Sequence, residues 1–198
     1  MPKLWEQTIE GHRQAVHDAA LAATGALVAE RGLRAVSMSE VAQLTGIGRA
    51  TLYKYFPDVE TMLAAWHERQ IRAHLDQLEA VVATDGSAAE RLSAVLREYA
   101  RLSVERHGEE LATLLHRGAH VGKAQLELRE LVRRLVADGA TAGNFRDDVP
   151  ADELADYCLH AVTAARGLRS KAAVERLITV ILAGLRQPTP SEPLSLRS

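Results

Sequence analysis

The chain is poor in cysteine and in long apolar runs, and each shortage excludes a class of protein. Its single cysteine, Cys158, permits no disulfide within the chain and fits a reducing compartment. No stretch of about 18 consecutive apolar residues occurs, so we expect no membrane-spanning helix. The N-terminus also lacks the apolar core of a secretory signal. We therefore expect a cytoplasmic protein without a membrane partner.

Charge of one sign is not in excess either. The 24 Lys and Arg residues face 26 Asp and Glu residues, which gives a formal net charge of −2. Residues 1–57 are only slightly positive, and the remainder is slightly negative. If the protein binds DNA, a few individual Lys and Arg side chains and helix N-termini must neutralise the phosphates, because the chain carries no net positive charge.

Aromatic residues are scarce as well, at 4% of a chain in which hydrophobic residues make up 47%. Abundant Leu and Ala, with few prolines before the tail, favour an all-helical protein of one or two domains. The sequence shows no glycine-rich phosphate loop after a strand, no G-x-S-x-G motif and no obvious pair of catalytic carboxylates. We therefore expect that the protein is not an enzyme and needs no cofactor.

Residues 37–56, SMSEVAQLTGIGRATLYKYF, predict two short helices joined by a tight turn. Ser37 and Glu40 have the spacing of a reciprocal capping box, which starts the first helix. Gly46 occupies the turn, where a positive φ is needed. The second helix begins near Gly48 and must end before Pro57. Its polar side chains are left facing outward, and a DNA groove is the natural partner for such a face.

The remaining apolar spacing predicts helices on both sides of this pair. Residues 1–10 show no clear pattern and are expected to fray, and a helix follows at 11–30 with Gly32 just beyond its end. Asp58 is expected to cap a long helix at 59–82, and Ser87 and Glu90 form a second capping box. Further helices are predicted from 87 towards Gly108 and at 109–116, 123–138, 150–166 and 171–185, with a loop at 139–149.

The N-terminal segment resembles the DNA-binding domain of the tetracycline-repressor (TetR/AcrR) family. The likeness covers roughly residues 11–66 and is carried by the helix-turn-helix, above all by T-G-I-G-R-A-T-L-Y-K-Y-F followed by Pro57. Two departures are visible. Gly48 supplies no capping hydroxyl, and the segment after Pro57 begins with acids where a cationic phosphate contact often lies.

The resemblance implies a DNA-binding transcriptional regulator, a ligand-responsive repressor that binds a palindromic double-stranded operator as a homodimer. The expected architecture is all-α, with a three-helix DNA-binding domain at 1–57, a helical ligand-binding and dimerisation bundle at 58–186, and a disordered tail at 187–198. The residues expected to contact DNA lie at the starts of the two short helices and along the second: Ser37, Ser39, Gly48, Arg49, Ala50, Thr51, Tyr53, Lys54 and Tyr55.

The resemblance also implies a cavity for an unknown small-molecule effector and a dimer interface on the last two helices. Apolar stripes and aromatic residues with polar tips suggest the pocket residues Trp66, Leu96, Tyr99, Leu115, His116, Leu135, Phe145 and Tyr157. Small and aliphatic residues suggest the dimer interface: Ala161, Ala164, Val174, Leu177, Ile181 and Gly184.

A second hypothesis concerns two histidines. His116 and His120 are four residues apart and could bind a metal from one face of a helix, as in a small helical metal-binding protein or a metal sensor. Gly118 lies between them, and no third ligand has a fixed spacing, so we expect no metal site. Cys158 could sense oxidation, but its place in a predicted packed helix favours a buried, inert thiol.

Overall fold

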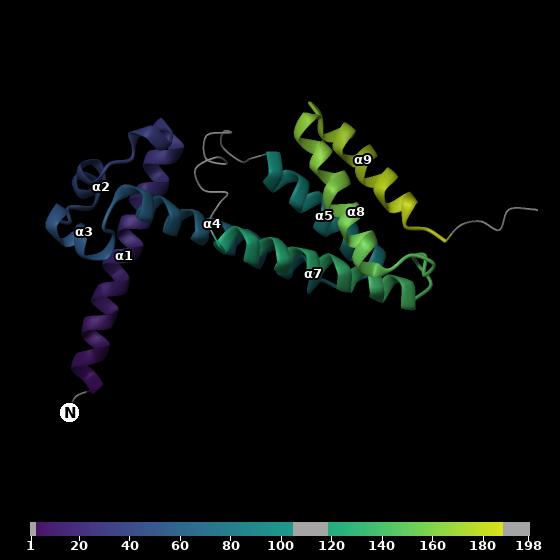
Figure 1. Ribbon diagram of the computed structural model, residues 1–198, viewed down its shortest axis with the longest axis horizontal. Helices are drawn as coiled ribbons and strands as arrows, with labels where there is room; N and C mark the ends of the chain where they lie inside the picture. The colour runs from purple at the N-terminus through teal and green to yellow at the C-terminus, as the bar shows by residue number, and fades with distance from the viewer. Residues whose placement is uncertain (1–2, 105–118, 188–198) are drawn as a thin grey trace, which may run out of the picture. The chain divides into compact units, whose positions relative to one another are not determined.

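The computed structural model describes residues 3–104 and 119–187, with side chains over 10–103 and 121–187. Within these ranges the chain forms eight α-helices and two short 3-10 helices, and no strand (Figure 1). The prediction of an all-α protein is confirmed. No described helix combines the length and apolar character needed to cross a membrane. The predicted helix at 109–116 lies outside the described residues.

The chain divides into two compact units, and the first continues to Ala73. We predicted a boundary at Pro57, but the long helix α4, Val59–Val82, contributes to both units. Met62 and Leu63, in the first two turns of α4, are buried in the core of the N-terminal unit. The start of this helix is therefore part of the first unit's fold and is not a linker.

The N-terminal unit is built on three more helices, α1 Lys3–Arg31, α2 Met38–Thr45 and α3 Arg49–Tyr55, with a 3-10 turn, η1, at Leu33–Ala35. The expectation that residues 1–10 fray is wrong for 3–10, because α1 begins at Lys3. This stretch contains several strong helix formers and neither Gly nor Pro, so a helix can extend through it at little cost.

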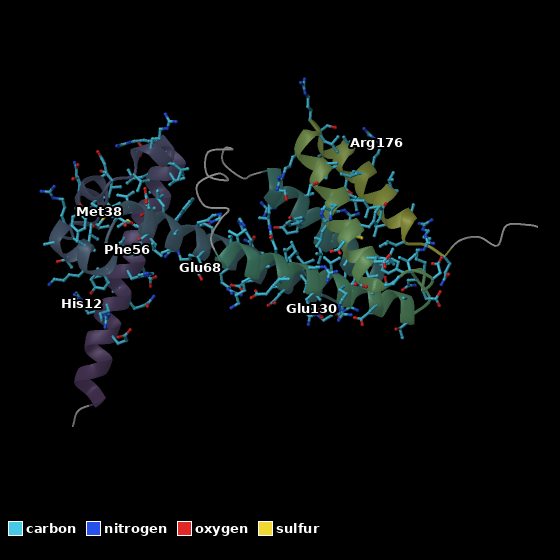
Figure 2. The ribbon with its side chains drawn as sticks, viewed as in Figure 1. His12, Met38, Phe56, Glu68, Glu130 and Arg176 are labelled. Carbon is cyan, nitrogen blue, oxygen red and sulfur yellow. The ribbon has the colours of Figure 1, made fainter. Side chains whose placement is uncertain are left out.

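The turn after α1 follows the predicted local chemistry. Gly32 has a φ of 80°, in the left-handed region that favours glycine, and its N–H donates to the Val28 carbonyl at 3.0 Å. The chain then reverses through η1 into α2. Figure 2 labels Met38 and Phe56 in this unit, and both side chains are buried in its core.

The second unit contains α5 Ala88–Val104, α8 Ala151–Val162, η2 Thr163–Gly167, α9 Lys171–Gly184 and most of α7 Ala119–Thr141. Its helices are joined by ion pairs as well as by apolar packing. The guanidinium of Arg129 on α7 donates to both carboxylate oxygens of Asp156 on α8, at 2.6 and 2.9 Å. Arg97 on α5 donates to Glu175 on α9 at 2.8 Å.

The predicted loop at 139–149 is shorter than expected, because α7 continues to Thr141. Phe145 is buried and anchors this loop to the core of the second unit. Its backbone N–H donates to the Gly139 carbonyl at 3.1 Å, and the N–H of Arg146 donates to Leu185 at 2.7 Å. Gln187, predicted to begin the disordered tail, donates to the Phe145 carbonyl at 3.2 Å. The rest of that tail lies outside the described residues.

Candidate nucleic-acid interface

The turn between α2 and α3 is closed by backbone geometry and by one hydroxyl. Gly46 has a φ of 71°, and its N–H donates to the Ala42 carbonyl at 2.9 Å. The Thr45 hydroxyl donates to Val41 at 2.7 Å and accepts from the N–H of Ile47 at 3.2 Å. We had assigned no role to Thr45, although a Thr-Gly pair at a helix end is a recognisable turn signal. These contacts set the angle at which α3 leaves α2.

Helix α3 has one face in the core and one face in solvent. Leu52 is fully buried and Phe56 is 2% exposed. Gly48 is the N-cap in an extended conformation, and no side chain caps the helix. The helix ends at Tyr55, before Pro57.

The predicted DNA-contacting residues fall into two groups. Most are exposed and can be reached by a partner: Ser39, Gly48, Arg49, Ala50, Tyr53 and Lys54. Ser37, Thr51 and Tyr55 are half-buried. We predicted that Tyr55 faces outward, but its side chain packs partly against the N-terminal core. The open face of α3 therefore centres on Arg49, Tyr53 and Lys54.

The start of α2 differs from the predicted capping box. Ser37 is the N-cap, and its hydroxyl accepts from the N–H of Glu40 at 3.1 Å, as expected. The carboxylate of Glu40 does not return to Ser37. It accepts instead from Nη1 of Arg31, the last residue of α1, at 3.4 Å. We had given no role to Arg31, because only the packing of α1 against α2 brings it to Glu40.

The acidic start of α4 has a structural explanation. Asp58 precedes the helix, and its carboxylate accepts from the N–H of Thr61 at 2.7 Å, which confirms the predicted cap. This hydrogen bond lowers the pKa of Asp58 below its ordinary value, so the group is ionised at neutral pH. Its charge is directed at the amides of its own helix.

The structure separates the predicted pocket residues. Leu96, Leu135 and Phe145 are fully packed in the core of the second unit, and Tyr99 is half-buried on α5. Two other predicted pocket residues do not lie in that core. Trp66 packs against the N-terminal core, and Tyr157 is 40% exposed on α8. Leu115 and His116 lie outside the described residues.

The predicted dimer residues also differ in exposure. Ile181 is 1% exposed and packs in the core of its own unit, so within a single chain it offers little surface to a second copy. Ala164 and Gly184 are exposed, and a Cβ atom on Gly184 would lie 2.9 Å from the Tyr157 hydroxyl oxygen. The remaining three are half-buried: Ala161, Val174 and Leu177. We missed Val180, which is 64% exposed on α9 and apolar.

The histidine hypothesis gains no support from the described side chains. Those of His116 and His120 lie outside them, and the described residues contain no group of three or more His, Cys, Asp or Glu that could hold a metal ion. Cys158 is buried in α8, and burial raises the pKa of its thiol to about 12. Such a thiol is almost entirely protonated at neutral pH, as expected for an inert packing residue.

Comparison with known proteins agrees with this geometry. Residues 20–66 match the model of the bacterial regulatory proteins of the tetR family. The chain is 29% identical over 182 residues to the HTH-type transcriptional repressor KstR2 of Rhodococcus jostii, covering 82% of this chain and 87% of that protein. The match to the family model includes the whole α2–turn–α3 segment described above.

Two solved structures share the fold. A TetR/AcrR-family transcriptional regulator from Thermobifida fusca has a TM-score of 0.74 at 23% identity, over 87% of this chain and all of that one. FadR from Bacillus subtilis, solved in complex with stearoyl-CoA, has a TM-score of 0.65 at 15% identity, over 85% and 98% of the two chains. Residues 20–66 thus match the DNA-binding domain of the tetR family, and the chain as a whole has the fold of TetR/AcrR-family regulators.

Proposed function

We propose that this regulator is a cytoplasmic, ligand-responsive repressor that binds a palindromic operator as a homodimer. The observation that carries the proposal is the exposed face of α3, where Arg49, Tyr53 and Lys54 are open to a partner while Leu52 and Phe56 hold the helix on its core. A helix held in this way can enter a major groove as a rigid unit.

The proposed DNA contacts follow from side-chain chemistry. Arg49, at the first position of α3, can donate two hydrogen bonds to O6 and N7 of a guanine, a common specific contact. Lys54 and Tyr53 suit the phosphate backbone, and the N-terminus of α2, with Ser37 and Ser39, offers amides and hydroxyls to another phosphate. Because the domain is nearly neutral, each of these contacts should contribute a large share of the DNA affinity.

The homodimer proposal rests on apolar groups that α8, η2 and α9 leave in solvent. Val180 is 64% exposed, Tyr157 40% and Leu168 36%, and Ala164 is exposed nearby in sequence on η2. Two copies would place two recognition helices on successive major grooves, roughly 34–36 Å apart.

Light scattering after gel filtration should report a dimer, and Val180→Glu should shift the protein towards monomer. A monomeric wild-type protein would contradict the proposal.

The effector is proposed to act by linkage, because a ligand changes DNA affinity only through its preference for one conformation. Two relatives suggest where to start a screen: KstR2 of Mycobacterium tuberculosis is described as a ketosteroid regulator, and FadR was solved with stearoyl-CoA. Steroids and long-chain acyl-CoA thioesters are therefore the first classes to test for release of the protein from DNA.

DNA binding itself is tested by fluorescence anisotropy with the DNA upstream of the protein's own gene and with a scrambled duplex of equal length. Arg49→Ala should cost about 1–3 kcal/mol of discrimination at one base pair. Lys54→Ala should weaken binding to both duplexes and reduce the salt dependence. Unchanged discrimination at every operator position in Arg49→Ala would contradict the assignment, and folded wild-type protein without sequence preference would contradict the function.

A further inference from the structure

The chain contains two Ser-x-x-Glu segments that fold differently. At the start of α5, the carboxylate of Glu90 accepts from both the N–H and the hydroxyl of Ser87, at 2.8 and 2.9 Å, which completes the capping box. At the start of α2, the carboxylate of Glu40 turns to Arg31. The same local sequence thus gives two outcomes, and the difference lies in the arginine that α1 places beside Glu40.

The fold has little need of this contact. Arg31 and Glu40 are 50% and 41% exposed, and Nη1 and Oε2 are 3.4 Å apart. Surface ion pairs of this kind contribute little to the stability of a protein, because water screens them and two long side chains must be ordered. Arg31 also lies 3.5 Å from Glu30, so a second carboxylate shares its guanidinium. Stability therefore does not explain this arrangement.

The position of Glu40 suggests another role. It lies in the first turn of α2, next to Ser39 and one turn from Ser37, where we place a DNA phosphate. A carboxylate here cancels the partial positive charge of the helix N-terminus, and it also repels a phosphate. In a domain of nearly neutral charge, one such repulsion is a large share of the electrostatic term that governs DNA affinity.

We propose that Arg31 is a positioning residue for DNA binding, which holds and neutralises the Glu40 carboxylate so that the N-terminus of α2 can accept a phosphate. The inference rests on the DNA binding proposed above and adds to it a residue on α1 outside the helix-turn-helix. Arg31 acts through Glu40, so removal of the carboxylate should make the arginine dispensable.

The test is a double-mutant cycle of Arg31→Gln, Glu40→Gln and the double variant, with operator and scrambled duplexes at 50 to 300 mM NaCl. Arg31→Gln should weaken binding to both duplexes about threefold to tenfold, with a salt dependence reduced by about one ion. Glu40→Gln should bind at least as tightly as wild type. The double variant should bind as tightly as Glu40→Gln within about twofold, so that Arg31→Gln has almost no effect once the carboxylate is gone, a non-additivity expected only if the two residues are coupled.

Arg133→Gln, which breaks the ion pair of Arg133 with Glu130 in the second unit, is the control with the same change in net charge. Thermal unfolding of every variant separates an effect on DNA from an effect on folding. Wild-type affinity in Arg31→Gln, or a double variant as weak as Arg31→Gln, overturns the inference while leaving the proposed function intact. Folded wild-type protein that binds neither duplex overturns the proposed function, and the inference falls with it.

Discussion

Replacing Gly139 by alanine should destabilise the second unit, because the site has no room for a methyl group. A Cβ atom on Gly139 would lie 2.1 Å from Cδ2 and 2.4 Å from Cε2 of Phe145, closer than real side chains approach. The ring is 2% exposed, and the Phe145 backbone is hydrogen-bonded to the Gly139 carbonyl. Phe145 therefore cannot move away without disturbing the loop that follows α7.

The magnitude follows from two opposing effects. Forcing an extra carbon into a packed core costs about 1–3 kcal/mol. Alanine in place of glycine within a helix recovers about 0.5–1 kcal/mol. The net loss should be about 0.5–2 kcal/mol in the free energy of unfolding. Gly122 is a matched control in the same helix, since nothing lies within 4 Å of its Cβ position, and Gly122→Ala should be neutral or stabilising.

Urea unfolding followed by circular dichroism measures both variants against wild type. Protein concentration must be equal in all samples, because self-association shifts apparent stability. Gly139→Ala should lower the midpoint without a change in the m value. Adding Phe145→Leu should cost less in the Gly139→Ala protein than in wild type, because the smaller side chain relieves the clash. A Gly139→Ala protein as stable as Gly122→Ala would contradict the predicted clash with Phe145.

Two further predictions concern titratable groups in the second unit. With its pKa raised to about 12 by burial, the Cys158 thiol should resist a thiol reagent in native protein at pH 8 and react only when urea unfolds the chain, and rapid native labelling would contradict this. The hydrogen bond from Arg129 lowers the pKa of the Asp156 carboxyl below its ordinary value. The ion pair therefore stabilises the folded protein above the ordinary pKa of aspartate, and this contribution is lost as the pH falls through the lowered pKa. The difference in Tm between wild type and Asp156→Asn should therefore shrink on acidification, and a constant difference would contradict the ion pair.

Helix boundaries set by local chemistry could be predicted from the sequence. Ser37 and Asp58 each cap the helix predicted for them, and Ser170 caps α9 in the same way, because a side-chain oxygen three residues before a free amide needs no distant partner. Gly32 and Gly46 adopt the positive φ expected of glycines at helix ends. The exposed face of α3 followed in the same way, from apolar spacing over a short helix.

Features that depend on a second element could not be predicted. The capping box at Glu40 fails because α1 brings Arg31 to it, and neither residue signals the other in sequence. Tyr55 looks like an outward-facing residue on a helical projection, but its side chain packs partly against the N-terminal core. Trp66 was assigned to the second unit, yet α4 contributes its first half to the N-terminal core, so the boundary lies at Ala73.

The all-helical class, the N-terminal caps of α2, α4 and α5 and the helix-turn-helix could be read from the amino-acid sequence. These depend on residues a few positions apart, whose interactions form wherever the segment folds. Three-dimensional packing was needed to show that Ile181 belongs to the core of its own unit, that Val180 is exposed to solvent, and that Gly139 makes room for Phe145. Such facts depend on which faces of distant helices meet, and an apolar stripe is the same in sequence whether it packs within one chain or faces another.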